Sequence, residues 1–254
     1  MIETLDYWNK RALEKKDSRA ITHYDIHQRE FEIEFISKYL DVNHKVLDLG
    51  CGNGYTTNRV KHLVKFIKGI DFSNEMITRA LHDNIKSEKC NFEIGDARTL
   101  NLNEKFNIII TQRCLINILS WEEQKIALMK IYDHLDKNGI YLMFEGSSDG
   151  KKKLNELRKT FKLDPIPAVK YNLDFQDSKL LDFMENFFSL FEIKTFGQYE
   201  YVTRIIYPCS IFPDKPEYES DFHDIALNSV RNLEDFMPEI SKLKLWVWKK
   251  NKNN

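Results

Sequence analysis

An acidic residue and three closely spaced glycines form the part of the sequence best suited to bind a ligand. They lie in the segment Asp48-Leu-Gly50-Cys-Gly52-Asn-Gly54, at the end of a short apolar run. Glycines allow a sharp turn and let a ligand lie against backbone amides. A dinucleotide-binding turn has the spacing G-x-G-x-x-G, whereas here the third glycine comes one residue earlier. A carboxylate at Asp48 is also poorly placed for a pyrophosphate, so the segment favours a cationic ligand.

Further polar residues stand at the ends of other short apolar runs. In chain order these are Asp71, Asp96, Gln112 with Arg113, and Glu145. The carboxyl ends of parallel strands meet at one edge of a sheet, which is where doubly wound sheets bind ligands. We therefore expect these side chains and the glycine turn to share one crevice.

Hydrophobic periodicity indicates the elements that position these residues. Apolar runs predict strands at 45–49, 66–72, 91–94, 106–111 and 140–144. Helical patterns separate them, at 24–40, 55–64, 73–85 and 121–135. Because strands alternate with helices, the chain predicts an α/β fold with a doubly wound, mostly parallel sheet.

The pattern changes after the fifth strand. Two more strands are predicted, at 191–196 and 244–248, and an aromatic, proline-bearing insertion lies between them at about 198–240. We expect this insertion to cap a pocket, with a small separate core as the alternative. The expected organisation is an N-terminal helical cap, 1–40, followed by a main domain, 41–254, that contains the insertion.

The glycine segment and the strand-end residues together resemble the class I S-adenosylmethionine-dependent methyltransferases. The first motif of that family is an acidic residue followed by G-x-G-x-G, as in Val46-Leu-Asp48-Leu-Gly50-Cys-Gly52-Asn-Gly54. The resemblance covers about 40–147 and implies a seven-stranded sheet of order 3-2-1-4-5-7-6 with the last strand antiparallel. It also implies S-adenosylmethionine as cofactor and S-adenosylhomocysteine as product.

The resemblance also assigns roles to individual residues. Asp71 is expected to accept both ribose hydroxyls, and Asp96 to meet the adenine amino group. Phe72 and Met76 are expected to pack on the adenine ring. The cofactor-binding set implied in this way is Asp48, Gly50, Cys51, Gly52, Asp71, Phe72, Met76, Asp96, Ala97 and Gln112.

The acceptor site is expected beside the fourth and fifth strands. Arg113 and Asn117 follow the fourth strand, Glu145 ends the fifth, and all three are expected to face the crevice. The R-x-L-I-N pattern and the terminal glutamate are similar to those of small-molecule methyltransferases of bacterial sugar and surface-polysaccharide pathways. An arginine at this position suits a carboxylate, phosphate or phosphoramidate on the acceptor. The alternative for Arg113 is an ion pair with a nearby acid.

A hydroxyl acceptor also needs a base and a dry site. Glu145, His23 and His27 are the candidate bases. Tyr7, Trp8 and Tyr207 are the aromatic candidates to cover and contact the substrate.

The expected reaction is O-methylation of a small, anionic acceptor, with N-methylation of a small amine as the alternative. A nicotinamide-dependent oxidoreductase and a noncatalytic ligand-binding protein remain open as other classes. The N-P-P-Y-type tetrapeptide of DNA and protein-amide methyltransferases does not follow the fourth strand, so bases and glutamine side chains are not expected acceptors.

Composition limits the remaining possibilities. The 254 residues carry a formal charge of −1, which argues against nucleic acid as a partner, and 42% of them are hydrophobic, which is enough for a folded core. No apolar run reaches the ~20 residues of a membrane helix. The acidic N-terminus does not resemble a signal peptide, so a cytoplasmic location is expected. The expected oligomeric state is a monomer or a homodimer. The four cysteines have no metal-ligand spacing, so no metal is expected.

Overall fold

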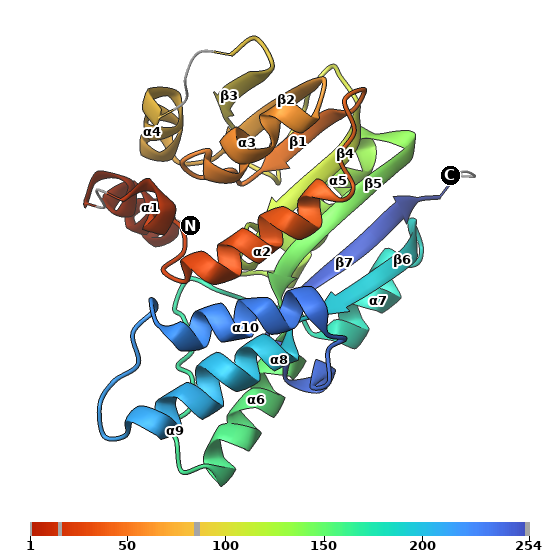
Figure 1. The fold of residues 1–254 in the computed structure, drawn as a ribbon. Helices are drawn as coiled ribbons and strands as arrows, with labels where there is room; N and C mark the ends of the chain where they lie inside the picture. Colours follow the sequence, from red (N-terminus) through yellow and green to blue (C-terminus); the bar gives the residue numbers. More distant parts are fainter. Residues whose placement is uncertain (1, 15–16, 84–86, 252–254) are drawn as a thin grey trace.

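Seven strands form one central sheet in the computed structural model, which describes residues 2–14, 17–83 and 87–251 (Figure 1). Their order is β3-β2-β1-β4-β5-β7-β6. The first five strands run parallel, whereas β7 is antiparallel to both β5 and β6. The predicted order and the antiparallel last strand are confirmed. The strands are β1 Lys45–Leu49, β2 Phe66–Asp71, β3 Cys90–Ile94, β4 Phe106–Gln112, β5 Leu135–Gly146, β6 Phe188–Thr195 and β7 Leu243–Lys250.

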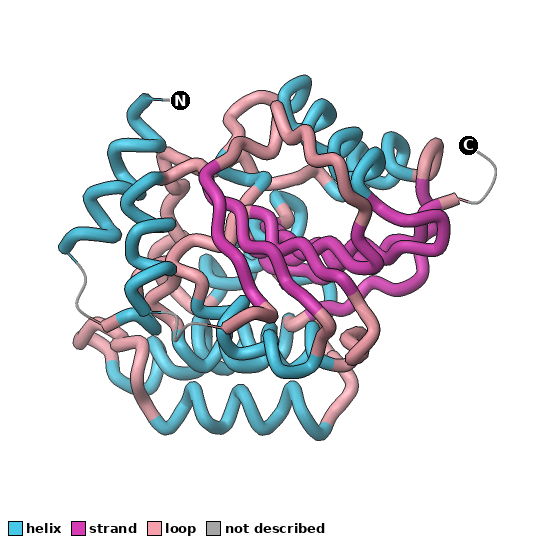
Figure 2. The backbone as a smooth tube through the Cα atoms, turned by 90° about the horizontal axis from the view of Figure 1, so that it is seen from above, coloured by secondary structure: helices cyan, strands magenta, loops and turns pink. Residues whose placement is uncertain are grey.

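Helices cover both faces of the sheet, as the view in Figure 2 shows. This layering buries β4 on both sides, which fits its run of three isoleucines. The helices are α1 Ile2–Glu14, α2 Ile26–Ser37, α3 Tyr55–Val60, α4 Asn74–Asp83, α5 Trp121–His134, α6 Ser148–Thr160, α7 Asp177–Met184, α8 Gly197–Tyr201, α9 Tyr207–Ile211 and α10 Asp221–Asn232.

Two hydrophobic cores lie on opposite faces of the sheet. On one face, residues of α5 and α7 pack with Trp246 and Trp248 of β7. On the other, Phe31 of α2 stacks on Phe196, with ring centroids 4.6 Å apart, and residues of α10 join the same cluster. The helix α2 therefore belongs to the core of the sheet domain. Within the predicted cap 1–40, α1 lies outside these two cores, beside α4 (Figure 1), and Ile21 after it packs with Ala12 of α1 and Met76 of α4 in a small cluster.

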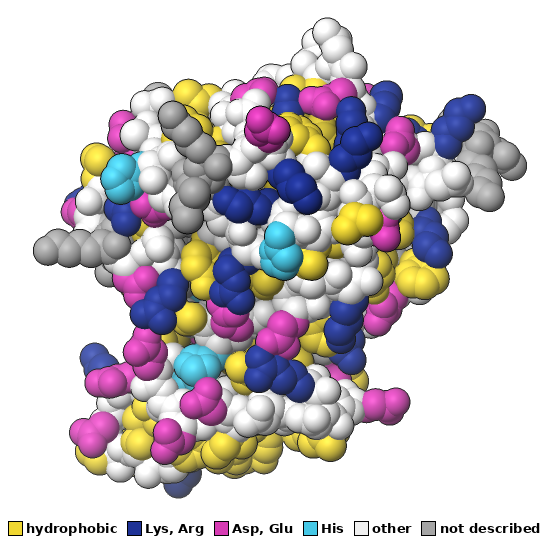
Figure 3. Space-filling view, turned by 45° about the horizontal axis from the view of Figure 1, so that its top comes forward, with side chains coloured by type: hydrophobic (Ala, Val, Ile, Leu, Met, Phe, Trp, Pro, Cys, Tyr) yellow, Lys and Arg dark blue, Asp and Glu magenta, His cyan; other side chains and the backbone are white. Residues whose placement is uncertain are grey.

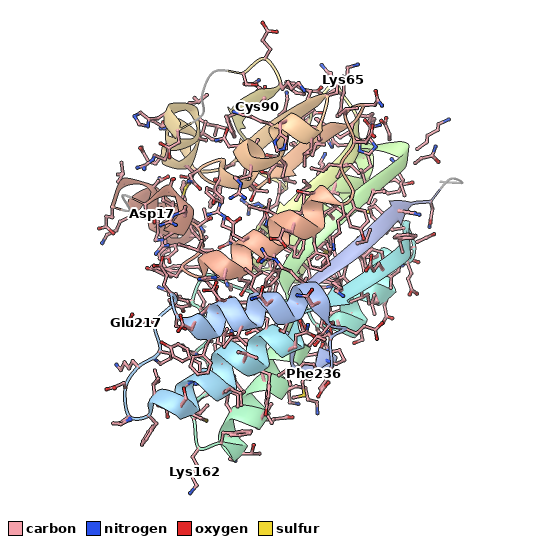
Figure 4. All side chains as sticks on the ribbon, viewed as in Figure 1. Asp17, Lys65, Cys90, Lys162, Glu217 and Phe236 are labelled. Carbon is pink, nitrogen blue, oxygen red and sulfur yellow. The ribbon has the colours of Figure 1, made fainter. Side chains whose placement is uncertain are left out.

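The insertion lies at the carboxyl edge of the parallel strands. Gly146 at the end of β5 pairs with Leu243 at the start of β7, and Thr195 at the end of β6 pairs with Lys244. The segment between β6 and β7 must therefore begin and end at that edge. Figure 4 agrees: Glu217 lies far from Lys65 and Cys90, which stand at the amino ends of β2 and β3.

Strand β5 is longer than the sequence predicts. It begins at Leu135, which pairs with Phe106, and the register shifts before Ile108 pairs with Ile140. The Asn138-Gly139 pair therefore lies inside an irregular stretch of strand and does not end the preceding helix.

The surface carries both charge signs. On the face drawn in Figure 3, basic and acidic side chains are interspersed, as the near-zero net charge implies. Within the described residues, we find no helix with the length and apolar character needed to cross a bilayer.

Candidate active site

The glycine turn after β1 has a backbone that other residues adopt only with strain. Gly50, Gly52 and Gly54 have φ values of +78°, +55° and +70°. A Cβ atom on Gly50 would lie 2.4 Å from the Sγ atom of Cys114, and one on Gly52 would lie 2.6 Å from the Cγ2 atom of Thr22. The turn therefore needs glycine both for its conformation and for close packing.

Two buried carboxylates flank this turn. Asp48 accepts a hydrogen bond from the Thr57 hydroxyl, and Asp71 accepts from the backbone amides of Gly52 at 2.8 Å and Ser73 at 2.9 Å. Burial raises the pKa of both Asp48 and Asp71 to about 6, although these donors oppose the shift. Both groups are therefore ionised at neutral pH, so the turn is held next to two negative charges.

One cavity joins the strand ends of β1, β2, β3 and β4. Every residue of the predicted cofactor-binding set lines it, although the role of each remains a prediction: Asp48, Gly50, Cys51, Gly52, Asp71, Phe72, Met76, Asp96, Ala97 and Gln112.

Asp96 has a partner that the sequence analysis did not expect. The Nε atom of Arg98 donates to its carboxylate at 2.9 Å, and Arg98 also pairs with Glu123 at 3.0 Å. Burial by itself would raise the pKa of Asp96, but the hydrogen bonds from Arg98 lower it below its ordinary value. Arg98 and Glu123 line the cavity as well.

The N-terminal helix closes the side of the cavity near β4. Trp8 of α1 lines the cavity, and its indole Nε1 donates to the Oδ1 atom of Asn117 at 3.1 Å. Asn117 belongs to η3 (Leu115–Asn117), the short helix after β4, and donates to the carbonyl of Arg113. Two predicted substrate residues, Trp8 and Asn117, are thus brought together across the chain.

Arg113 lines the same part of the cavity and also forms an ion pair. Its guanidinium pairs with Glu32 of α2, a fully buried carboxylate that also accepts from Gln112 at 2.8 Å. Arg113 has a φ of +52°, which is rare for a residue with a side chain. The structure thus contains the ion pair that was the alternative for Arg113, whereas its role toward the acceptor stays a prediction.

The structure corrects the expectation that Glu145 faces the crevice. Its side chain is fully buried, does not line the cavity, and accepts hydrogen bonds from the backbone amides of Cys114, Leu115 and Ile116 at 3.0–3.2 Å. Burial raises the pKa of Glu145 to about 7 against these donors. Glu145 thus anchors the turn that carries Arg113 and Asn117.

Three other predicted site residues lie outside the cavity lining. His27 pairs with Asp224 at 3.3 Å, and Tyr7 stacks on Tyr171. Tyr207 is 7% exposed and stacks on Phe222, within the insertion.

The insertion as a whole contributes no residue to the described lining of this cavity. Its Ile205 and Ile240 instead pack with Leu154 of α6 in a small core of their own. The insertion is therefore neither a cap that contacts this cavity nor a wholly separate core, because Tyr199 and residues of α10 pack in the core of the sheet.

Helix α2 and its entry segment supply cavity residues that the sequence analysis did not identify. Thr22 and Arg29 both line the cavity, and Arg29 is 3% exposed. Polar residues recur along α2 at the helical spacing Asp25, Gln28 with Arg29, and Glu32, and all four are buried. Glu30 and Glu34 of α2 are charged as well, so nothing in the sequence pattern marked these four residues as the buried ones.

Comparisons with known proteins agree with this geometry. A family model described as a methyltransferase domain matches residues 40–185. A malonyl-[acyl-carrier protein] O-methyltransferase from Bacillus cytotoxicus is 30% identical over 165 residues, which cover 60% of this chain and 55% of that protein. The chain thus spans about half the length of the curated relatives it matches.

Two solved structures share the whole fold. The N-methyltransferase NodS from Bradyrhizobium japonicum, in complex with S-adenosylhomocysteine, aligns over 98% of both chains with a TM-score of 0.61 and 11% identity. Magnesium protoporphyrin IX methyltransferase from Synechocystis, with the same molecule bound, aligns over 98% of this chain and 99% of that one, with a TM-score of 0.62 and 11% identity.

The family match covers more than half of the chain and includes the glycine turn and the first five strands. The sheet order is the one that the sequence resemblance implied. The chain belongs to the methyltransferase-domain family and has the fold of the class I S-adenosylmethionine-dependent methyltransferases.

Proposed function

We propose that this protein transfers a methyl group from S-adenosylmethionine to an oxygen of a small, anionic acceptor. The observation that carries the proposal is the single cavity that joins the glycine turn, Asp48 and Asp71 to Arg113. A cofactor site and a cation suited to an acceptor therefore share one cavity. The name of the Bacillus relative, an O-methyltransferase of a malonyl group, supports an anionic acceptor and transfer to oxygen.

The cavity residues fit the cofactor. The glycine turn, with its positive φ values, places Gly50, Cys51 and Gly52 in the cavity lining. Asp48 and Asp71 place negative charge beside it, which suits a sulfonium cation and ribose hydroxyls. When bound, S-adenosylmethionine supplies a methyl group activated on a positively charged sulfur. Trp8 and Asn117 close the cavity wall, and excluding water there favours attack by the positioned acceptor.

The arrangement favours an acceptor oxygen that is already ionised. No histidine lies in the described lining of the cavity, and the Glu145 carboxylate accepts hydrogen bonds from the backbone of the turn after β4. Asp96 and Glu123 are both paired with Arg98. A carboxylate needs no base, since it carries its nucleophilic electron pair at neutral pH. A carboxylate oxygen is therefore the acceptor atom that we propose.

A turnover assay tests this function directly. Release of S-adenosylhomocysteine is measured with a panel of carboxylates, including malonyl thioesters and uronic acids, and with amines and neutral sugars at equal concentration. Turnover with a carboxylate supports the proposal. Turnover confined to amines would show N-methylation. Turnover confined to neutral sugars would contradict the proposal that the acceptor is anionic.

Arg29 is expected to bind the carboxylate of the cofactor's methionine part. Its guanidinium is buried in the cavity wall, and burial lowers its pKa to about 10, so it remains charged at neutral pH. Arg29→Gln is expected to weaken S-adenosylhomocysteine binding about tenfold, the effect of one charged hydrogen bond. Affinity for 5′-methylthioadenosine, which lacks that carboxylate, is expected to stay unchanged in calorimetry.

The exposed Arg231, which pairs with Glu34 on the surface, provides the matched control. Arg231→Gln is expected to leave both affinities at the wild-type values. Equal weakening of the two ligands by Arg29→Gln would mean that Arg29 only shapes the cavity.

Arg113 is expected to recognise the acceptor. Arg113→Lys keeps the positive charge beside Glu32 but loses the planar fork that pairs with an oxyanion. The KM for the acceptor is expected to rise about tenfold, while the affinity for S-adenosylhomocysteine stays within about twofold of wild type. Steady-state kinetics and calorimetry measure the two quantities. Wild-type KM in the lysine variant would leave Arg113 with only its structural ion pair.

A further inference from the structure

His23 lies next to the cofactor cavity but outside its lining. Its neighbour Thr22 lines the cavity, whereas His23 does not. The side chain remains partly exposed, yet burial is the largest cause of the lowered pKa of His23. His23 is therefore half-buried at the border of the cavity.

A continuous series of contacts joins His23 to three cations. The backbone amide of Asp25 donates to His23, the Asp25 carboxylate pairs with Arg204, and Glu200 contacts both Arg204 and Lys242. Asp25 also accepts from the Gln28 amide, and the Gln28 side chain donates to Glu32, the partner of Arg113. The three cations come from the turn after β4, the segment before β7 and the insertion, and after burial they are among the causes that lower the pKa of His23. We call the group formed by His23, Arg113, Arg204 and Lys242 the cationic recess.

Each of the three cations in the recess forms an ion pair with a buried carboxylate. The side chains of the carboxylates are at most 1% exposed, whereas those of the cations are 16–21% exposed. The cations therefore lie on the accessible side of each pair. The pairs are Arg113 with Glu32, Arg204 with Asp25 at 2.7 Å, and Lys242 with Glu200 at 3.2 Å.

The hydrogen bonding of His23 makes it a donor. Its Nδ1 atom accepts from the backbone amide of Asp25 at 2.9 Å. The neutral ring therefore carries its proton on Nε2. In the part of the chain that the structure describes, no residue is hydrogen-bonded to that Nε2 atom. His23 is thus suited to donate to an anion, and it is not suited to be the base that the sequence analysis considered.

We propose that the cationic recess binds a second anionic group of the acceptor, a carboxylate or a phosphate, that is not itself methylated. Arg113 and Thr22, the neighbour of His23, both line the cofactor cavity, so an acceptor can extend from the cavity to the recess. Donors in the recess engage the electron pairs of the bound oxyanion, which leaves the opposite end of the acceptor to react. This proposal rests on the proposed function, because it assigns part of the same acceptor.

Calorimetry on the full chain tests the recess separately from the function. The protein is first titrated with S-adenosylhomocysteine, and the saturated complex is then titrated with malonate, inorganic phosphate or neutral malonamide at constant ionic strength. Saturable binding of malonate, of phosphate or of both, but not of malonamide, is expected. The anion that binds more tightly identifies the class of the second group.

Two variants locate the binding. His23→Asn keeps an acceptor for the Asp25 amide but removes the Nε2 donor, and Lys242→Met leaves Glu200 with Arg204, 3.7 Å away. Each is expected to weaken the anion about tenfold and to leave the affinity for S-adenosylhomocysteine unchanged. The exposed His62 supplies the matched control, since His62→Asn is expected to change neither.

The outcomes separate the two proposals. Failure of the first titration with S-adenosylhomocysteine would overturn the proposed function. Normal cofactor binding with no saturable anion binding, with equal binding of malonamide, or with anion affinity unchanged in both variants would overturn the recess alone.

Discussion

Replacing Asp71 by alanine is expected to weaken the binding of S-adenosylhomocysteine by about tenfold or more. The change removes the carboxylate proposed for the ribose hydroxyls, and each charge-assisted hydrogen bond contributes about 1.5–3 kcal/mol. It also releases the amides of Gly52 and Ser73, so the glycine turn loses its anchor on β2. Calorimetry with the wild type and the variant measures the effect.

The pH dependence of the same affinity gives a second readout. Burial raises the pKa of Asp71 to about 6, and the carboxylate is the form that accepts hydrogen bonds. The wild-type affinity is therefore expected to be constant above neutral pH and to fall as the pH drops through about 6. The alanine variant is expected to lose part of this dependence, because Asp48, whose pKa is also about 6, remains.

The surface residue Asp133 is a suitable control, because its side chain is exposed on α5. Asp133→Ala is expected to bind S-adenosylhomocysteine like the wild type at every pH. Unchanged affinity in Asp71→Ala would remove Asp71 from the cofactor site and leave it only the task of supporting the turn.

Replacing Glu145 by alanine is expected to destabilise the fold by about 3 kcal/mol or more. Three backbone amides, of Cys114, Leu115 and Ile116, donate to this buried carboxylate. Each buried donor that loses its acceptor costs about 1–3 kcal/mol. Urea unfolding followed by circular dichroism measures the free energy of unfolding. The turn after β4 is expected to loosen before the sheet does, so Arg113 is expected to lose its fixed position.

Glu185 at the end of α7 is exposed and serves as the comparison. Glu185→Ala is expected to change the free energy of unfolding by less than about 0.5 kcal/mol. If Glu145→Ala kept wild-type stability but lost turnover, Glu145 would regain the role of a base that the sequence analysis gave it.

The sequence determined the cofactor side of the cavity. Asp48, Asp71, Asp96 and Gln112 each stand at or just after the end of a strand, and the structure places all of them in one lining. This was predictable because the carboxyl ends of parallel strands converge at one edge of the sheet, whatever the details of packing. The glycine spacing was equally local, since a positive φ is a property of single residues.

Only the tertiary structure decided the acceptor side. Glu32 is 81 residues away from Arg113 in the chain, and Trp8 is 109 residues away from Asn117. Their pairing depends on how α1 and α2 dock, which side-chain periodicity does not specify. Glu145 stands at a strand end like the aspartates, yet it points beneath a turn, because the buried amides of that turn require an acceptor. A strand-end position places a residue at the edge of the sheet, whereas the hydrogen bonds that neighbouring loops require decide whether it meets the ligand or the backbone.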